Sequence, residues 1–433
     1  MKRLIGLLAI GAAVAACLTG CGGAGVSAQS TSAASSASGS GSGTLVVWNW
    51  GDPGGESTEY SAQVLAVFKK EHPNVQVQVV SQPNANYYTL LGAAIQSNSG
   101  PDVVLFNGGS QIWSRTSALV PLNKYVPAAD AKRLTGWDMF SKGSTKYAVP
   151  TTMQGFALYY NKKVLKEAGI TSAPKTWDQL SADCAAVKSK TQASCFALGN
   201  KEGLGFGLFF SEFGPGILTP TEYQNWLDGK RDWNSPDVKK VFDLWKQTYD
   251  DGWYNAGVNS TAMFNDSFNL FSAGKAAFVV GLTSGSDNYR QFGQYLGKNL
   301  GVTLPPIENP KVTETFMPIE GGIGFGVTKW TKNPKLAAQL ALAYADHGAL
   351  TTFSVDAGAV SADTTITPKT TNQAGKDIFS WLKNGKSLLH DKVSADTENL
   401  MGQLTTEILE GSVSVDSAIS QLAASDAKTS GQL

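Results

Sequence analysis

Two polar, glycine-containing loops carry the residues best suited to bind a small uncharged ligand. The sequence WNWGD at 48–52 places Trp50 and Asp52 directly after an apolar run, and FNGGS at 106–110 places an amide and a hydroxyl after another. Aromatic rings can cover the apolar C–H face of a sugar, and carboxylate or amide groups can pair with its hydroxyl rim. Because a hydroxyl group is neutral, such a site needs no excess of charge. The two loops therefore indicate carbohydrate chemistry.

A third polar cluster interrupts the stretch 146–163, KYAVPTTMQGFALYYNKK. Pro150 fixes its own φ angle and keeps Val149 out of a helix, and the apolar run at 156–160 is aromatic enough for a buried strand. The polar residues between these two strands are Thr151, Thr152, Gln154 and Gly155. Such a cluster marks either a crossover between domains or a binding site.

The first two loops follow predicted strands in an alternating α/β pattern. Apolar or alternating runs at 45–48, 75–80 and 103–106 predict strands, and helical periodicity at 60–70 and 87–96 separates them. This order is typical of a parallel sheet with helices on both faces. Ligands bind beyond the carboxyl ends of the strands in such sheets, which is where both loops lie. A second α/β region follows, and helical patterns end the chain.

Length and composition narrow the classes of function. The 433 residues suffice for two domains. Lys+Arg and Asp+Glu both number 35, so the chain lacks the basic excess typical of a nucleic-acid-binding surface. Neither an HExxH nor a GxSxG motif occurs. We therefore expect no nucleic-acid partner, no metal and no cofactor.

The N-terminal residues are expected to direct export. Residues 1–20 join two basic residues to an apolar run, 4–16, that is too short to span a bilayer. The sequence LTGC, ending at Cys21, resembles the lipobox of bacterial lipoproteins and implies a lipidated Cys21 at the extracellular face of the cytoplasmic membrane; Cys17 fits more loosely. Residues 21–43, mostly Gly, Ala and Ser, predict a flexible tether. An ordinary secretory signal with incidental cysteines is the alternative.

The other two cysteines, Cys184 and Cys195, are expected to form a disulfide. An exported location permits the bond, and closing so short a loop would stabilise the fold by at most about 3 kcal/mol. Two buried free thiols are the alternative. Two isolated cysteines cannot form a zinc site alone.

Seven segments, in order, resemble the extracellular solute-binding proteins of carbohydrate ABC transporters (family 1), in the maltose-binding-protein-like branch. The segments are VLAVFKKEHPNVQVQVV, GPDVVLF, ALVPLNKYV, KYAVPTTMQGFALYYNKKVLKEAGI, KTWDQL, FSAGKAAFVVG and GGIGFGVTKW. The resemblance covers about residues 45–425 and implies a fold like that of the type II periplasmic binding proteins. In that α/β fold, two lobes are joined by a multi-crossing hinge, with the ligand cleft between them.

The resemblance further implies how the protein would work and where its lobes end. A monomeric receptor of a Gram-positive-type bacterium would close on an oligosaccharide and deliver it to ABC permease subunits, which a cytoplasmic ATPase drives. Lobe 1 would comprise 44–152 plus 318–360, and lobe 2 would comprise 153–317 plus 361–433. The crossings are expected near 152–156, 314–322 and 357–370.

Single binding residues follow where the family motifs align. Asp52 matches the polar residue that follows the first strand in the family. Phe106 stands where the family often has an aromatic ring, and Asn107 stands at the edge of the cleft. Gln154 stands where the family has an acidic crossover residue, and Ser284 stands where a tryptophan commonly stacks on sugar. These two departures imply that the ligand is held differently here.

Further candidates complete the predicted site. The segment FSEFG implies that Glu212 and Phe213 reach the cleft. The candidate stacking rings are Trp50, Tyr87, Phe213 and Trp253. The remaining candidate contacts are Asp287, Glu320, Gly321 and Asp356. Three of these assignments have structural alternatives: Asp52 could cap a helix, Gln154 could satisfy the hinge backbone, and Glu320 could lie in a solvated turn.

Two other functions fit parts of the sequence. A secreted glycoside hydrolase would also need aromatic platforms and a pair of carboxylates, drawn from Asp52, Glu212, Asp287 and Glu320. A sugar-sensing or adhesive surface lipoprotein could use the same fold. We expect a non-enzymatic binding protein, and product formation from oligosaccharides would contradict that expectation.

Overall fold

The computed structural model describes residues 43–50, 58–83, 86–283 and 288–429. The predicted signal peptide, the tether, Cys17 and Cys21 lie outside the described residues, as do Asp52, Ser284 and Asp287. Among the described residues, no helix has the length and apolar character needed to cross a membrane.

The first half of the fold is a five-stranded sheet, here called sheet one, with the order β2-β1-β3-β12-β6. Its strands are β1 (Gly43–Asn49), β2 (Val75–Ser81), β3 (Val103–Asn107), β6 (Ala148–Pro150) and β12 (Ile323–Val327). Strands β1, β2 and β3 are parallel, as the sequence predicted, whereas β12 runs antiparallel to both β3 and β6. A distant segment of the chain therefore completes the sheet.

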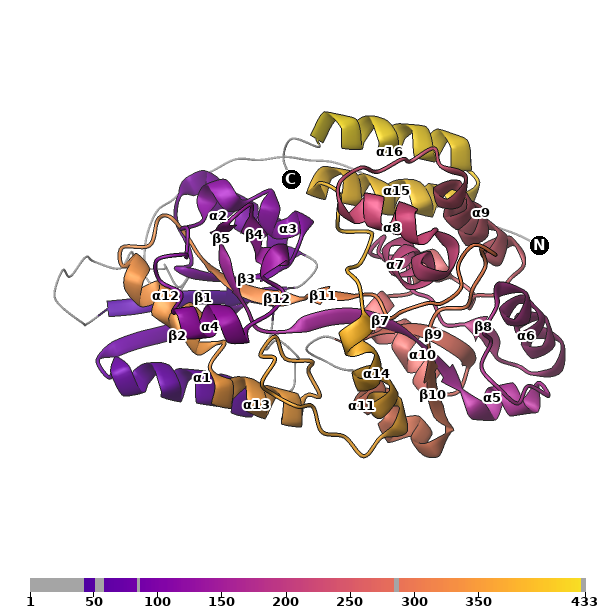
Figure 1. Ribbon diagram of the computed structural model, residues 1–433, viewed down its shortest axis with the longest axis horizontal. Coiled ribbons are helices and arrows are strands. Elements are labelled where there is room, and N and C mark those ends of the chain that lie inside the picture. The colour runs from indigo at the N-terminus through magenta and orange to yellow at the C-terminus, as the bar shows by residue number, and fades with distance from the viewer. Residues whose placement is uncertain (1–42, 51–57, 84–85, 284–287, 430–433) are drawn as a thin grey trace, which may run out of the picture. The chain divides into compact units, whose positions relative to one another are not determined.

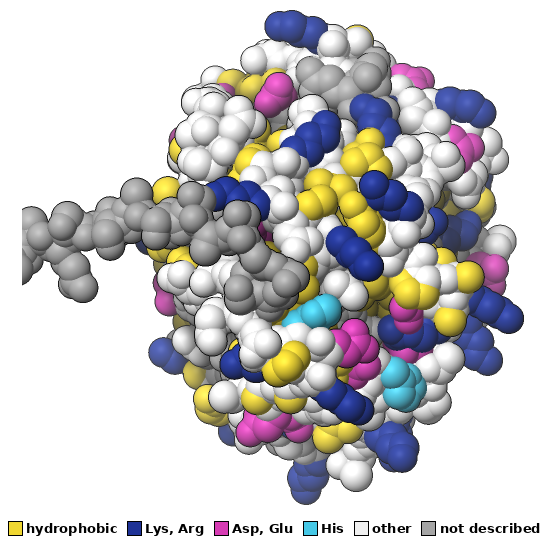
Figure 2. Space-filling model, turned by 90° about the vertical axis from the view of Figure 1, so that its left-hand side faces the viewer, with side chains coloured by type: hydrophobic (Ala, Val, Ile, Leu, Met, Phe, Trp, Pro, Cys, Tyr) yellow, Lys and Arg dark blue, Asp and Glu magenta, His cyan; other side chains and the backbone are white. Residues whose placement is uncertain are grey.

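Helices cover both faces of sheet one. Strand β3 presents apolar side chains to both faces, and each face is therefore packed against helices. Val103 and Leu105 join a core with residues of α1, α12 and α13, whereas Val104 and Phe106 join a core with residues of α2 and α3. The helices are α1 (Thr58–Glu71), α2 (Tyr87–Ser97), α3 (Ser110–Trp113), α4 (Ala128–Arg133), α12 (Pro334–Ala343) and α13 (His347–Asp356). On the face shown in Figure 2, basic side chains are interspersed with apolar, polar and acidic ones.

The second sheet, sheet two, has the order β10-β7-β9-β8, and β11 pairs with the beginning of β7. Its strands are β7 (Met153–Asn161), β8 (Ser194–Phe196), β9 (Ala276–Leu282), β10 (Leu300–Thr303) and β11 (Ile319–Gly321). Its helices are α5 (Lys162–Glu167), α6 (Trp177–Lys190), α7 (Gly205–Ile217), α8 (Pro220–Leu227), α9 (Pro236–Asp250), α10 (Phe268–Ser272), α11 (Asn288–Leu296), α14 (Gln373–Trp381), α15 (Ala395–Glu410) and α16 (Val415–Thr429). Figure 1 shows α15 and α16 packed beside α7 and α9.

Among the described residues, three segments connect the two sheets. The chain leaves β6 of sheet one and enters β7 of sheet two through Thr151 and Thr152, and it returns from β11 to β12 through Gly322. A Cβ atom on Gly322 would lie 2.5 Å from the Cβ atom of Gln154, so only glycine allows the strands to pass this closely. The third connection runs from α13 to α14 (Figure 1).

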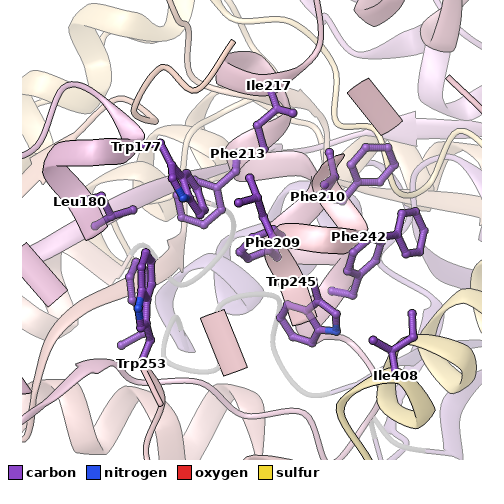
Figure 3. Packing of buried hydrophobic residues seen from close by; sticks show 14 of the residues in the cluster. Trp177, Leu180, Phe209, Phe210, Phe213, Ile217, Phe242, Trp245, Trp253 and Ile408 are labelled. Atoms are coloured by element: carbon purple, nitrogen blue, oxygen red, sulfur yellow. The ribbon is translucent and has the colours of Figure 1, made fainter. Parts of the chain in front are cut away.

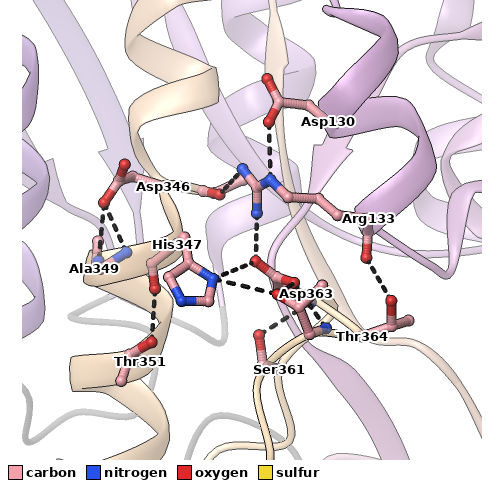
Figure 4. Close-up of polar contacts among 12 residues, drawn as sticks. Asp130, Arg133, Asp346, His347, Ala349, Thr351, Ser361, Asp363 and Thr364 are labelled. Carbon is pink, nitrogen blue, oxygen red and sulfur yellow. Dashed lines mark hydrogen bonds and ion pairs between the residues drawn. The ribbon is translucent and has the colours of Figure 1, made fainter.

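An ion-pair cluster attaches the third connection to sheet one (Figure 4). Arg133 on α4 contacts Asp130 at 2.8 Å and the buried Asp363 at 2.6 Å, and it donates to the Ala345 carbonyl. The His347 ring nitrogen Nδ1 lies 3.1 Å from Asp363. Burial raises the pKa of Asp363, but hydrogen bonds, those of Thr365 first, outweigh burial and leave the pKa below its usual value. The connection is therefore anchored by charge rather than by apolar packing alone.

A disulfide joins Cys184 on α6 to Cys195 on β8, with a Cα–Cα distance of 5.0 Å. Both residues belong to the aromatic core that lies between the helices and sheet two. The structure therefore contains the predicted disulfide and not the alternative of two free thiols.

Candidate functional site

The carboxyl ends of β1 and β3 bring an aromatic wall together. Trp50 is half-buried, and its ring meets Tyr87 at 4.9 Å and Tyr88 at 6.1 Å, edge-on in both cases. The half-buried Tyr88 ring stacks near Phe106, and its hydroxyl accepts a hydrogen bond from the Asn107 backbone amide at 2.9 Å. Trp50 and Tyr88 thus keep part of their surface available beside the first two predicted loops.

Tyr87 and Phe106 hold a different place from the one predicted. Both side chains are completely buried. The Tyr87 hydroxyl donates to the carbonyl oxygen of Leu105 at 2.8 Å and lies 3.2 Å from that of Trp48, which ties α2 to the sheet. Burial raises the pKa of Tyr87 well above its usual value. These two rings form the core behind the wall, and Tyr88 is the ring that the sequence reasoning missed.

A polar contact joins the end of β3 to α15. The Ser110 hydroxyl and the Gln111 amide nitrogen both donate to the Glu398 carboxylate, the latter at 3.4 Å. Helix α15 begins where Ser394 caps it, because the Ser394 hydroxyl accepts from the Thr397 amide at 3.1 Å. That cap places Glu398 in the first turn, facing α3. Burial raises the pKa of Glu398.

Arg115 adds a cation to the same group. Its guanidinium lies 4.8 Å from the centre of the Tyr88 ring and donates to the Gln111 carbonyl at 2.7 Å. Burial lowers the pKa of Arg115, while Tyr88 and Glu398 oppose that shift. A ring, a carboxylate and a planar guanidinium in one place can recognise both the face and the hydroxyl rim of a sugar.

A buried ion pair lies beside the crossing strands. The Lys392 ammonium is 2.5 Å from Glu320 on β11 and 3.6 Å from Asp391, and it approaches the Trp113 ring. Glu320 also accepts from the Leu388 amide at 3.0 Å. Burial and the neighbouring Asp391 raise the pKa of Glu320, whereas Lys392 opposes the shift. Glu320 is therefore not in a solvated turn, because it is only 4% exposed and is paired.

The other two crossing residues are backbone neighbours of this pair. Gln154 is half-buried on β7 and is the register partner of Glu320. Gly321 is buried, and a Cβ atom there would lie 2.5 Å from the Gly136 carbonyl oxygen. Gly321 therefore allows close backbone packing, and only Gln154 of the two offers a side chain to a ligand.

Phe213 and Trp253, which the sequence proposed as stacking rings, lie in the core of sheet two (Figure 3). Their exposed fractions are 1% and 7%, and both rings pack on Trp177, at 5.3 and 5.8 Å between centroids. A small cavity of about 20 Å³ lies among these rings. Helical and strand periodicity could not separate core rings from ligand-facing ones, and this packing leaves neither face open.

Glu212 and Asp356 also lie away from the aromatic wall. Glu212 on α7 is fully buried, and neither carboxyl oxygen makes a hydrogen bond of normal geometry with the described residues. Burial raises its pKa well above the usual value. Asp356 ends α13, where Arg290 donates to its carbonyl oxygen. Neither placement brings the carboxylate to Glu398 or Arg115.

The residues missed by the sequence reasoning share one property. Tyr88, Arg115, Lys392 and Glu398 stand in no motif, and each becomes notable only through a partner far away in the chain. Ser110 and Glu398, for example, are 288 residues apart. Within the described residues, no three His, Cys, Asp or Glu side chains are grouped as metal ligands.

Known proteins resemble this chain in sequence and in structure. A family model described as bacterial extracellular solute-binding protein matches residues 54–349. The galactooligosaccharide-binding protein of Bacillus subtilis (strain 168) is 27% identical over 316 residues, which cover 70% of this chain and 69% of that protein. The maltodextrin-binding protein MdxE of the same strain is 24% identical over 332 residues, 73% of each chain.

The structural similarity extends further along the chain. A solved structure described as a chitin oligosaccharide binding protein has a TM-score of 0.78 at 18% identity, and the match covers 89% of this chain and 98% of that one. This similarity confirms the predicted two-lobed α/β fold of the type II periplasmic-binding-protein kind. Because the family model spans more than half of the sequence, the chain belongs to the bacterial extracellular solute-binding proteins.

Proposed function

We propose that this protein captures a carbohydrate, in particular an oligosaccharide, outside the cytoplasmic membrane and delivers it to the permease subunits of an ABC importer. One observation carries the proposal. The half-buried Trp50 and Tyr88 rings stand beside Arg115 and Glu398, so that aromatic surface and paired hydrogen-bonding groups meet in one place. The names of the two Bacillus subtilis relatives, which specify galactooligosaccharide and maltodextrin, support the ligand class.

The mechanism we propose is closure of two lobes around the ligand. Lobe 1 would consist of 44–152 plus 318–360, and lobe 2 of 153–317 plus 361–433. The short connections through Thr151–Thr152 and Gly322 are suited to a hinge because few residues need to change their dihedral angles. Ser110 and Glu398 would approach or separate as the lobes move, which makes closure sensitive to the ligand. Lipidation of Cys21 would keep the monomeric receptor at the extracellular face.

A thermal-shift screen against oligosaccharides tests the ligand class. We expect at least one galacto-, malto- or chito-oligosaccharide to raise the melting temperature, because a ligand that binds only the folded state stabilises it. The same mixtures should contain no new sugar products, and small-angle scattering should show a smaller radius of gyration with the ligand. Product formation would favour the glycosidase alternative, and failure of every sugar would contradict the proposal.

Glu398 offers a test of the site itself. Replacing Glu398 with alanine removes a charged acceptor, so we expect sugar affinity to fall by about 10- to 100-fold. Isothermal titration calorimetry measures the change. Glu407→Ala, on the same helix, removes a carboxylate that accepts a hydrogen bond from Gln403 at 2.9 Å; it is the matched control and should bind as the unmodified protein does. Equal affinities for both variants would place the ligand elsewhere.

A further inference from the structure

One edge of sheet two faces the crossings and carries side chains that the proposed site has not used. Strands β8 and β9 are parallel, so their carboxyl ends share this edge. Strand β7 is antiparallel to β9, and the pairing of Phe156 with Leu282 places the beginning of β7 there as well. The loop after β8 and the half-buried Gln154 therefore lie at the same edge, on the side where the chain crosses to sheet one.

A single turn of π-helix, Met263–Ser267, is packed against this edge. A Cβ atom on Gly199, in the loop after β8, would lie 2.6 Å from the Met263 backbone. The Met263 side chain packs with Phe156, Leu208 and Leu388. Turns of this kind are rare and often occur at functional sites. With Met263 turned inward, the next residue is presented outward.

Two exposed apolar side chains, Phe264 and Leu204, lie at this edge and are together called the shelf here. Phe264 is 38% exposed and Leu204 is 37% exposed, although large apolar side chains are usually buried. Phe264 touches Phe268 edge-on at 6.0 Å, which leaves ring surface open to solvent. Leu204 directly precedes α7, and both residues flank the loop after β8.

The Leu204 end of the shelf lies near the Glu398 site. Gly203, next to Leu204, packs directly on Gly402 of α15, where an added Cβ atom would lie 2.6 Å from the Gly203 carbonyl oxygen. Residues four apart on a helix are neighbours on one face, so Glu398 lies one turn before this contact and on the same side of α15. The shelf thus begins about one helical turn from the group formed by Ser110, Arg115 and Glu398.

Two exposed carboxylates flank Phe264. Glu202 accepts a hydrogen bond from the Met263 amide at 3.1 Å, and Asp266 accepts one from the Ala262 amide at 3.3 Å. Each carboxylate is oriented by the backbone and retains acceptor capacity toward solvent. An aromatic ring between two oriented acceptors matches a sugar ring, which has an apolar face and a hydroxyl rim.

We infer that Phe264, with Leu204 beside it, is a second ring-binding position on the sheet-two side of the site, opposite the wall formed by Trp50 and Tyr88. The inference rests on the proposed function and refines it: the ligand has at least two sugar rings, one stacked on each wall. Phe264 takes the stacking role that the sequence assigned to Phe213 and Trp253, which are buried.

Calorimetry with an oligosaccharide from the thermal-shift screen tests this inference. Phe264→Ala should weaken binding about tenfold, because an aromatic stacking contact and its buried area are lost, and Phe264→Tyr should retain most of the affinity. The loss should grow when a longer oligosaccharide of the same series replaces a monosaccharide. Tyr295→Ala, which removes a ring that is 67% exposed on α11, is the control and should leave binding unchanged.

The outcomes separate this inference from the proposed function. If the unmodified protein binds an oligosaccharide and Phe264→Ala binds it equally well, Phe264 does not contact the ligand and the inference fails alone. If the unmodified protein binds no sugar, the proposed function fails and the inference fails with it. Melting curves of Phe264→Ala and Phe264→Tyr in the absence of sugar should remain cooperative, which shows that both variants are folded.

Discussion

Replacing Lys392 with methionine is expected to lower the free energy of unfolding by about 3–5 kcal/mol at neutral pH. The Lys392 ammonium contacts Glu320 at 2.5 Å and Asp391 at 3.6 Å, and all three side chains are almost fully buried. Methionine would fill the space of the lysine stem but would leave two carboxylates without the cation that they share. Urea unfolding at pH 7.5 measures the loss.

Two comparisons identify the buried charges as the cause. The double variant Lys392→Met/Glu320→Gln should recover part of the stability, since it removes one of the stranded carboxylates. Lys239→Met removes an exposed partner of Asp416 and should cost less than about 1 kcal/mol. If Lys392→Met were no more damaging than Lys239→Met, the ion pair would not stabilise the crossing strands.

Glu212→Gln is expected to stabilise the protein, and the gain should increase with pH. Burial raises the pKa of Glu212 well above its usual value, so the folded state holds a proton that the unfolded state has released. The stability that this proton contributes is fully present below the unfolded pKa, about 4.3, and is lost as the pH rises toward the folded pKa. The loss reaches at most about 1.4 kcal/mol per pH unit.

Urea unfolding of both proteins at pH 5 and pH 8 measures this effect. Glutamine has the shape of the protonated acid but does not titrate, so the variant should lose less stability between the two pH values than the unmodified protein. Glu71→Gln, at the exposed end of α1, makes the same substitution on the surface and is the control variant. If the free energy of unfolding fell equally with pH in the unmodified protein and in Glu212→Gln, the Glu212 carboxyl group would have a hydrogen-bond partner or contact with water in solution.

Glu212 illustrates a limit of sequence reasoning. Its position in FSEFG, among aromatic residues, suggested a carboxylate that reaches a ligand. Helix α7 is instead buried on all sides, including Glu212 itself. Periodicity reports a buried face only when the opposite face is polar, and a helix surrounded by protein has no such contrast. Only packing against its neighbours reveals that this carboxyl group has no access to solvent.

Tyr87 and Tyr88, which are adjacent in the chain, show the same limit of sequence reasoning. The sequence predicted a helix here and named Tyr87 as a candidate stacking ring; the structure has the helix, but it buries Tyr87 completely. Successive residues of a helix point about 100° apart, so a shift of one position exchanges the buried ring for the half-buried one. The sequence did not fix that rotation, because both residues are tyrosines and both suit either place.

The sequence alone determined the strand–helix alternation, the polar loops at the strand ends and the family, because these depend on local periodicity and on motifs that keep their order. Only the tertiary structure decided which side chains meet. Glu398 reaches Ser110, and Phe264 and Leu204 flank one sheet edge, through contacts between segments far apart in the chain. No local pattern encodes such pairings, since they depend on how two sheets and α15 pack together.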